Sequence, residues 1–90
     1  PVNPDWAPAK QEELRERLQT AMEFYGSSPT LVECRTKNCI VEWYGHESIR
    51  KENPQAFMQM MLTASETGGV AHLVVDEFNK ERGAMIVVWD

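Results

Sequence analysis

The sequence lacks long apolar runs. No segment of its 90 residues approaches the roughly eighteen consecutive apolar residues that a membrane-spanning helix requires. The opening residues, Pro1 to Pro4, have neither the basic start nor the apolar centre of a signal peptide. We therefore expect a soluble chain. Because it does not begin with Met, we interpret it as the folded part of a longer product whose leader or anchor has been removed.

Basic residues are also few. Lys and Arg total 9 against 14 Asp and Glu, which gives a formal net charge of −5, and the basic residues form no stripe. Nucleic-acid-binding domains cluster Lys and Arg on one face. The charge pattern therefore predicts no nucleic-acid partner.

Motifs of the common enzyme classes are missing. The sequence has no Ser in a nucleophile elbow, no H-E-x-x-H, no phosphate-binding glycine loop and no dinucleotide fingerprint. Its acidic residues offer many carboxylate pairs, but their spacing selects none for acid and base work. A lone histidine in a loop or strand, such as His46 or His72, is more often structural than catalytic. We predict no catalytic residue, no cofactor and no enzymatic activity.

Length and composition predict one small globular domain over residues 1–90, with residues 1–5 as an extended N-terminal segment. The chain is 42% hydrophobic and 26% charged, which is ordinary for a globular protein. A chain this short buries only about 60 to 65% of the surface that its unfolded form exposes. Its stability is therefore small, and a covalent crosslink would matter.

The first third of the chain has the pattern of an amphipathic helix. Asp5 stands at the N-cap position, so the helix should start near Trp6, and Gly26 should end it. The apolar residues between them recur at helical spacing and form one stripe. These are Leu14, Leu18, Ala21, Met22 and Tyr25.

Two β-rich segments follow, Thr30–Cys34 and Cys39–Tyr44, separated by the polar residues 35–38. A loop of this length predicts a hairpin that places Cys34 directly opposite Cys39. The same register pairs Val32 with Val41 and Thr30 with Trp43 on the face toward the core. The other face carries Leu31, Glu33, Ile40, Glu42 and Tyr44. This face is too apolar for a fully solvated surface and too acidic for a core, so Leu31, Ile40, Glu42 and Tyr44 are our candidate partner-binding residues.

The second half of the chain repeats the order helix, strand, strand. Residues 45–52 are polar and predicted to be irregular, and Asn53-Pro54 supplies the N-cap and first residue of a helix that ends before Gly68-Gly69. Met60 falls off the expected apolar stripe of Phe57, Met58, Met61, Leu62 and Ser65, and is predicted to be exposed. Strands should follow at 70–78 and 84–89. The last is apolar at every position, which favours a central place in the sheet.

The order α-β-β-α-β-β predicts an α+β two-layer sandwich, with two helices on a roughly four-stranded antiparallel sheet. Two helices with one apolar stripe each cover only one face of such a sheet. The other face must meet water, a partner protein or a second copy of the chain.

Cys34 and Cys39 allow three chemistries: a disulfide, half of a metal site, or a redox-active dithiol. Directly opposed cross-strand positions bring two Cβ atoms close enough for a disulfide. A metal site would need two more ligands, and His46 and His72 form no closely spaced pair. Reactive dithiols are usually C-x-x-C at a helix N-terminus. We predict the disulfide, an oxidising compartment and no metal.

Several short elements together resemble a bacterial envelope domain. They are Asp5-Trp6-Ala7, Glu13-Leu14-Arg15, Glu33-Cys34-Arg35, Cys39-Ile40-Val41-Glu42 and His46. They are similar to an uncharacterised domain of envelope proteins and predicted lipoproteins, in which an acidic-Trp-Ala helix start precedes an E-C-R-x-x-x-C-x-V-E hairpin. The similarity covers about half of the chain, and Ile40 stands where that pattern has Arg. It implies a periplasmic or otherwise extracytoplasmic location and carries over no site residue.

From this sequence we expect a non-catalytic binding or assembly module of the bacterial cell envelope. Its partner would be another protein or a second copy, bound through the sheet face. Any membrane attachment would come from an anchor outside this chain. The alternative is a periplasmic sensory domain that binds a small apolar ligand between sheet and helices, and a small enzyme is the third.

Overall fold

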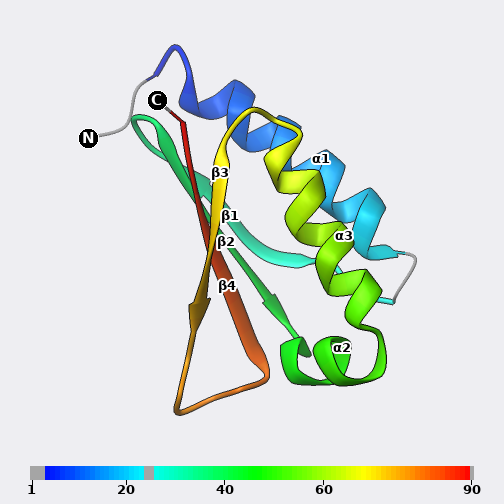
Figure 1. Cartoon of the computed structure of the whole chain (residues 1–90). Coiled ribbons are helices and arrows are strands. Elements are labelled where there is room, and N and C mark those ends of the chain that lie inside the picture. Colours follow the sequence, from blue (N-terminus) through cyan, green and yellow to red (C-terminus); the bar gives the residue numbers. More distant parts are fainter. Residues whose placement is uncertain (1–3, 24–25, 90) are drawn as a thin grey trace.

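Two helices cover one face of a four-stranded antiparallel sheet, and a third short helix lies at one end of it (Figure 1). The computed structural model describes residues 4–23 and 26–89, and only the backbone of Val75. The elements are α1 (Ala7–Glu23), β1 (Pro29–Cys34), β2 (Asn38–Tyr44), α2 (His46–Glu52), α3 (Pro54–Ser65), β3 (Val70–Val75) and β4 (Arg82–Val88). The predicted α+β fold is confirmed. Pro1 to Asn3, in the predicted extended segment, lie outside the described residues.

The sheet order is β1-β2-β4-β3, with every neighbouring pair antiparallel. The continuously apolar strand β4 therefore has the central place that its sequence predicts. Met85 and Val87 of β4 point toward the helices and are fully buried. They meet the α1 stripe, in which Leu14, Leu18 and Met22 are buried while Tyr25 lies outside the described residues.

Residues 45–52 are not irregular, because His46–Glu52 form helix α2. Gly45 starts the helix with a left-handed φ of 84°, which costs glycine little. The backbone N–H of His46 donates to the carbonyl oxygen of Glu81 at 3.0 Å and ties the helix to the β3–β4 loop. The sequence does not predict this helix, because its residues are mostly polar and only His46 and Ile49 pack toward the interior.

Helix α3 begins at Pro54 as predicted, and the Asn53 side chain accepts a hydrogen bond from the N–H of Ala56 at 3.2 Å. The predicted inward face is wrong. Met60 is 1% exposed, whereas Met58 and Leu62 are 58% and 54% exposed. The inward face is built around the small residues Ala56 and Ala64, which allow α3 to approach α1 and the sheet closely.

Strand registers and ends differ from the sequence-based prediction at three places, one of which is β4, which runs from Arg82 to Val88 rather than over 84–89. Trp43 pairs with Pro29 rather than Thr30, because the register shifts between Pro29 and Leu31. Strand β3 ends at Val75 rather than at residue 78. There the carboxylate of Asp76 accepts hydrogen bonds from the backbone N–H groups of residues 78 and 79, at 2.9 and 3.1 Å, and turns the chain.

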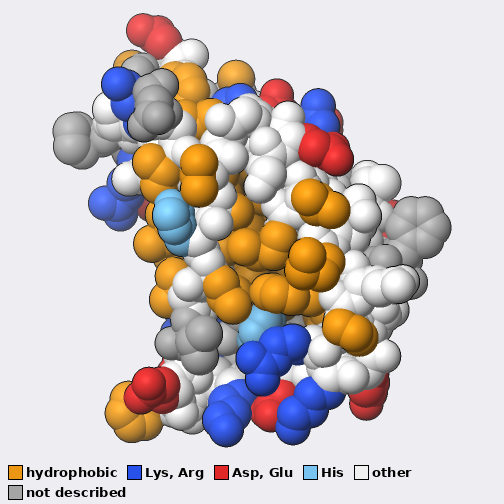
Figure 2. All heavy atoms as spheres, in the orientation of Figure 1, with side chains coloured by type: hydrophobic (Ala, Val, Ile, Leu, Met, Phe, Trp, Pro, Cys, Tyr) orange, Lys and Arg blue, Asp and Glu red, His pale blue; other side chains and the backbone are white. Residues whose placement is uncertain are grey.

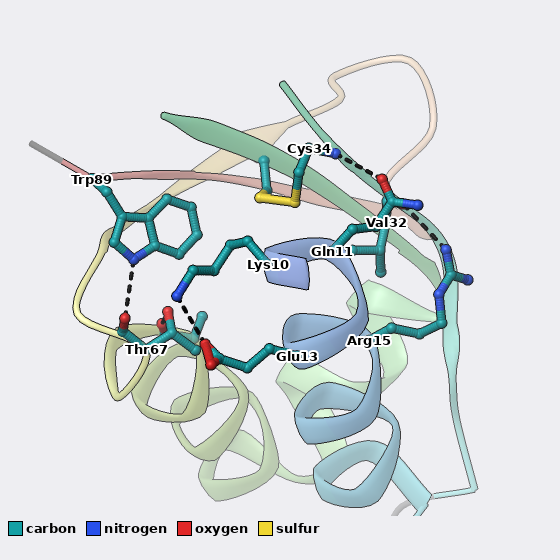
Figure 3. The surroundings of a disulfide bond; sticks show 10 residues. Lys10, Gln11, Glu13, Arg15, Val32, Cys34, Thr67 and Trp89 are labelled. Carbon is teal, nitrogen blue, oxygen red and sulfur yellow. Dashed lines mark hydrogen bonds and ion pairs between the residues drawn. A yellow bond between two sulfur atoms is a disulfide. The ribbon is translucent and has the colours of Figure 1, made fainter. Parts of the chain in front are cut away.

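The predicted disulfide is confirmed. Cys34 and Cys39 are directly opposed across β1 and β2, are bonded to each other, and lie buried under α1 (Figure 3). A disulfide suggests an oxidising, extracytoplasmic location. Among the helices that the structure describes, none has the length and apolar character to cross a membrane.

The three tryptophans belong to the core and its border. Trp43 is 1% exposed and lies over the sheet. The Trp89 and Trp6 rings form a T-shaped contact with centroids 5.3 Å apart. The indole N–H of Trp89 donates to the carbonyl oxygen of Thr67 at 3.0 Å (Figure 3). These contacts close the end of the domain where the last strand meets the start of α1.

Candidate functional site

Within residues 4–23 and 26–89, no helix covers the second face of the sheet, which we call the open face (Figure 1). Alternate residues of all four strands form it, and most of them are apolar. Its members are Leu31 and Glu33 of β1, Asn38, Ile40, Glu42 and Tyr44 of β2, Arg82, Ala84, Ile86 and Val88 of β4, and Val70, His72 and Val74 of β3. Val70 and Tyr44 are 60% and 63% exposed. The open face is thus a mainly apolar surface that also carries the charged residues Glu33, Glu42 and Arg82.

All four candidate residues from the sequence lie on the open face. The strand register places Ile40 beside Ile86, and Glu42 between Leu31 and Ala84. Tyr44 lies farther along β2, where it lines a separate hollow with Gly45 and Asn53. The structure therefore brings Leu31, Ile40 and Glu42 together and leaves Tyr44 at the end of the face.

A groove of about 450 Å³ crosses part of the open face. Ile40, Val74 and Ala84, from three different strands, line it together with the Glu42–Arg82 pair and residues 76–78 of the β3–β4 loop. Sequence reasoning missed the contributions of β3, β4 and this loop. The alternating apolar pattern of 70–74 and 84–88 predicts that these segments are strands with one apolar face. It does not predict the strand register that places their residues beside Ile40.

Charge in the groove is mainly negative. Arg82 donates from Nε to Glu42 Oε1 at 2.9 Å, and this hydrogen bond together with the charge of Glu42 raises the pKa of the Arg82 guanidinium. Arg82 is thereby paired, and the groove keeps two further carboxylates, Asp76 and Glu77. The groove therefore combines an apolar floor with a surplus of two negative charges.

The β3–β4 loop presents Phe78 at the rim of this groove. Its side chain is 100% exposed. The loop is held in shape by the Asp76 carboxylate and by Asn79, whose Oδ1 accepts from the N–H of Glu81 at 3.2 Å. A fully exposed aromatic side chain on a hydrogen-bonded turn is typical of a contact residue. Its burial against a partner is favourable, and little conformational entropy is lost because the turn is already ordered.

His46 is structural in its surroundings. It is 6% exposed and makes T-shaped ring contacts with Trp43 and Phe57, with centroid distances of 5.6 and 5.4 Å. Its Nδ1 has no hydrogen-bond partner among the described residues. His72, in contrast, is exposed on the open face.

The pKa of His46 is lowered from the usual 6.5, first by burial and then by the charge of Arg50, while Glu81 and Glu47 oppose the shift. The folded state therefore binds the proton less readily than the unfolded chain does. We expect the free energy of unfolding to decrease as the pH falls below about 6.5, toward the lowered pKa of the folded state.

Urea unfolding at pH values between about 7.5 and 5.5 measures this effect, since most carboxylates stay ionised over that range. A His46→Gln variant should be less stable overall but should lose less stability on acidification. His72→Gln is the matched control, because it removes the histidine that is exposed on the open face. An identical slope in wild type and His46→Gln would contradict the assignment.

No group of three or more His, Cys, Asp or Glu side chains suited to a metal ion occurs in the described ranges. Both cysteines are held in the disulfide. No protein-family model matches the chain, and no curated protein matches it.

Proposed function

We propose that this chain is a non-catalytic binding or assembly module of the bacterial cell envelope, acting in the periplasm and docking a partner protein on the open face. The observation that carries the proposal is the apolar open face, together with the fully exposed Phe78 at the rim of its groove. Contiguous apolar surface is costly on a protein with no partner and usually marks a contact site. The disulfide supports an extracytoplasmic location, and the resemblance of short sequence elements to envelope domains is our ground for proposing the periplasm.

The groove favours a partner segment of particular chemistry. An apolar floor of Ile40, Val74 and Ala84 beside the carboxylates of Asp76 and Glu77 suits an extended segment with alternating apolar and basic residues. Apolar side chains would fill the groove, and Lys or Arg would face the acidic rim. A second copy of this acidic chain suits the groove less well, because it would bring the same two carboxylates toward each other.

The space between sheet and helices favours surface docking over an internal ligand. Large side chains from both layers fill it, and each is at most 1% exposed: Leu14, Leu18, Met22, Val41, Trp43, Met60 and Met85. A sensory role would need an apolar cavity in this layer. No observation favours a small enzyme.

A peptide titration tests the proposal. The probe is a synthetic peptide of about seven residues with alternating Val and Lys, and the control peptide has Glu in place of Lys. We expect the Lys peptide to shift the amide resonances of Ile40, Val74 and Ala84, and the Glu peptide to leave them unchanged. Asp76→Asn with Glu77→Gln should weaken the preference between the two peptides, because it removes the surplus charge.

The double variant Ile40→Asp, Tyr44→Asp should abolish these shifts, while Met58→Glu on the helix side should not. The docking proposal fails if neither peptide shifts these resonances at millimolar concentration. It also fails if both peptides shift these resonances equally, or if the shifted resonances are confined to residues of β3 and α3.

A further inference from the structure

The two edge strands of the sheet differ in whether their outward backbone groups are blocked from pairing with a further strand. At the β1 edge, two side chains of α1 bond the outward backbone groups: Arg15 donates from Nη2 to the carbonyl oxygen of Val32 at 3.2 Å, and the N–H of Cys34 donates to Gln11 Oε1 at 3.1 Å (Figure 3). Pro29 and the register shift beside it interrupt the rest of this edge. These are the devices by which proteins block edge-to-edge pairing.

The β3 edge has none of these devices. Strand β3 is the six-residue segment Val70–Val75, which contains no Pro and no charged residue, and its pairing with β4 is regular. Within the described part of the chain, no side chain or loop forms a hydrogen bond to its backbone. A bare, regular, apolar edge is a template for a further strand.

Beside this edge, α3 presents an uncovered apolar side. Its Gln59 and Thr63 line a hollow shared with α1, so helical spacing places Phe57 and Met61 on the side away from α1. Met58 and Leu62 continue this surface and are 58% and 54% exposed. Figure 2 shows hydrophobic side chains gathered between the positions of β3 and α3. We call β3 together with this side of α3 the neutral edge.

The neutral edge has few charged residues, which favours a contact between two copies of the chain. Between Asn53 and Val75 the only charged residue is Glu66, although 26% of the whole chain is charged and its net charge is −5. Two copies of an acidic domain repel each other over most of their surface. At the neutral edge this repulsion is absent, and loss of charge is the compositional mark of an interface core.

We propose that the chain forms a two-fold homodimer in which β3 pairs antiparallel with β3 of a second copy, while the two α3 helices pack against each other. Such a contact is self-complementary, because each copy supplies a strand edge and an apolar helix side. It joins the two sheets into one of eight strands. A single added peptide strand would pair with the unpaired backbone groups of β3 but would leave Met58 and Leu62 in water. A second copy of the chain covers both, so it fits better. The dimer shares only Val74 with the groove, through the backbone of β3, and does not depend on the groove's occupant.

Sedimentation velocity from about 1 µM to about 1 mM protein tests the dimer. We expect the wild type to reach twice the monomer mass. Met58→Glu with Leu62→Glu, and separately Val70→Lys, should weaken association on the order of a hundredfold, because two-fold symmetry introduces every new charge twice into an apolar contact. All three side chains are exposed in the single chain, so circular dichroism should show unchanged folding.

Phe78→Glu and the double variant Ile40→Asp, Tyr44→Asp are the matched controls, since they change the open face and its rim, and both should leave the dimer intact. Hydrogen exchange is a second readout: the amides of 70–75 should become slower to exchange as protein concentration rises. The proposal is overturned by a wild type that stays monomeric up to about 1 mM. It is also overturned by a dimer that survives both neutral-edge variants, or one that only the open-face variant dissociates. None of these outcomes bears on the separate proposal that the open face binds a peptide segment.

Discussion

Replacing Gly83 by alanine is expected to lower the free energy of unfolding by about 3 kcal/mol. Gly83 is paired with Trp43 across β2 and β4, and the indole of Trp43 lies directly over it. A Cβ at this position would lie inside van der Waals contact with Cε2, Nε1 and Cζ2 of the ring. Trp43 is 1% exposed and is enclosed by the core, so the ring has no free space into which it can move.

Urea unfolding of the Gly83→Ala variant measures this loss, and thermal unfolding should show a midpoint lower by roughly 12 to 24 °C. The double variant Gly83→Ala, Trp43→Phe identifies the cause. Trp43→Phe should cost clearly less in the alanine background than in the wild type, because the smaller ring leaves room for the new methyl group. Equal costs in both backgrounds would show that the close approach of Trp43 is not what requires glycine.

Removing the disulfide is expected to cost about 2 kcal/mol, which lowers the melting temperature by roughly 8 to 16 °C. The bond closes a short hairpin loop, so the entropy that it removes from the unfolded chain is modest. The effect is still large for a domain of 90 residues with a small core. The replacement Cys34→Ser, Cys39→Ser tests this in thermal unfolding.

Both sulfur atoms belong to residues at most 3% exposed, so serine also buries two hydroxyl groups. The matched variant Cys34→Ala, Cys39→Ala separates this cost from the loss of the crosslink. Intact mass with and without reductant, after alkylation of protein taken from its native cells, shows whether the bond exists there. Labelling of both thiols before reduction would remove the support for an oxidising compartment. An unchanged melting temperature would mean that neighbouring contacts hold the hairpin.

The open face was partly predictable from sequence. The alternation in 39–44 places Ile40, Glu42 and Tyr44 on one side of a strand whatever the rest of the chain does. The groove was not predictable, because Val74, Ala84 and Phe78 join Ile40 only through the pairing of β2 with β4 and of β4 with β3. The ion pair of Glu42 with Arg82 has the same origin, since forty positions separate the two residues in the chain.

The sequence by itself determined the features that depend on neighbouring residues. The stripe of Leu14, Leu18 and Met22, the Asn53-Pro54 helix start and the disulfide of Cys34 with Cys39 all follow from periodicity, capping and a short hairpin loop, which act within a few residues. The tertiary structure alone decided the rest. It buried Met60 and exposed Met58 because two small alanines set the approach of α3, and it placed Trp43 over Gly83 through a long-range register. It also capped the β1 edge from α1 and left the β3 edge bare. These outcomes depend on which distant surfaces meet, and that is fixed only when the whole core packs.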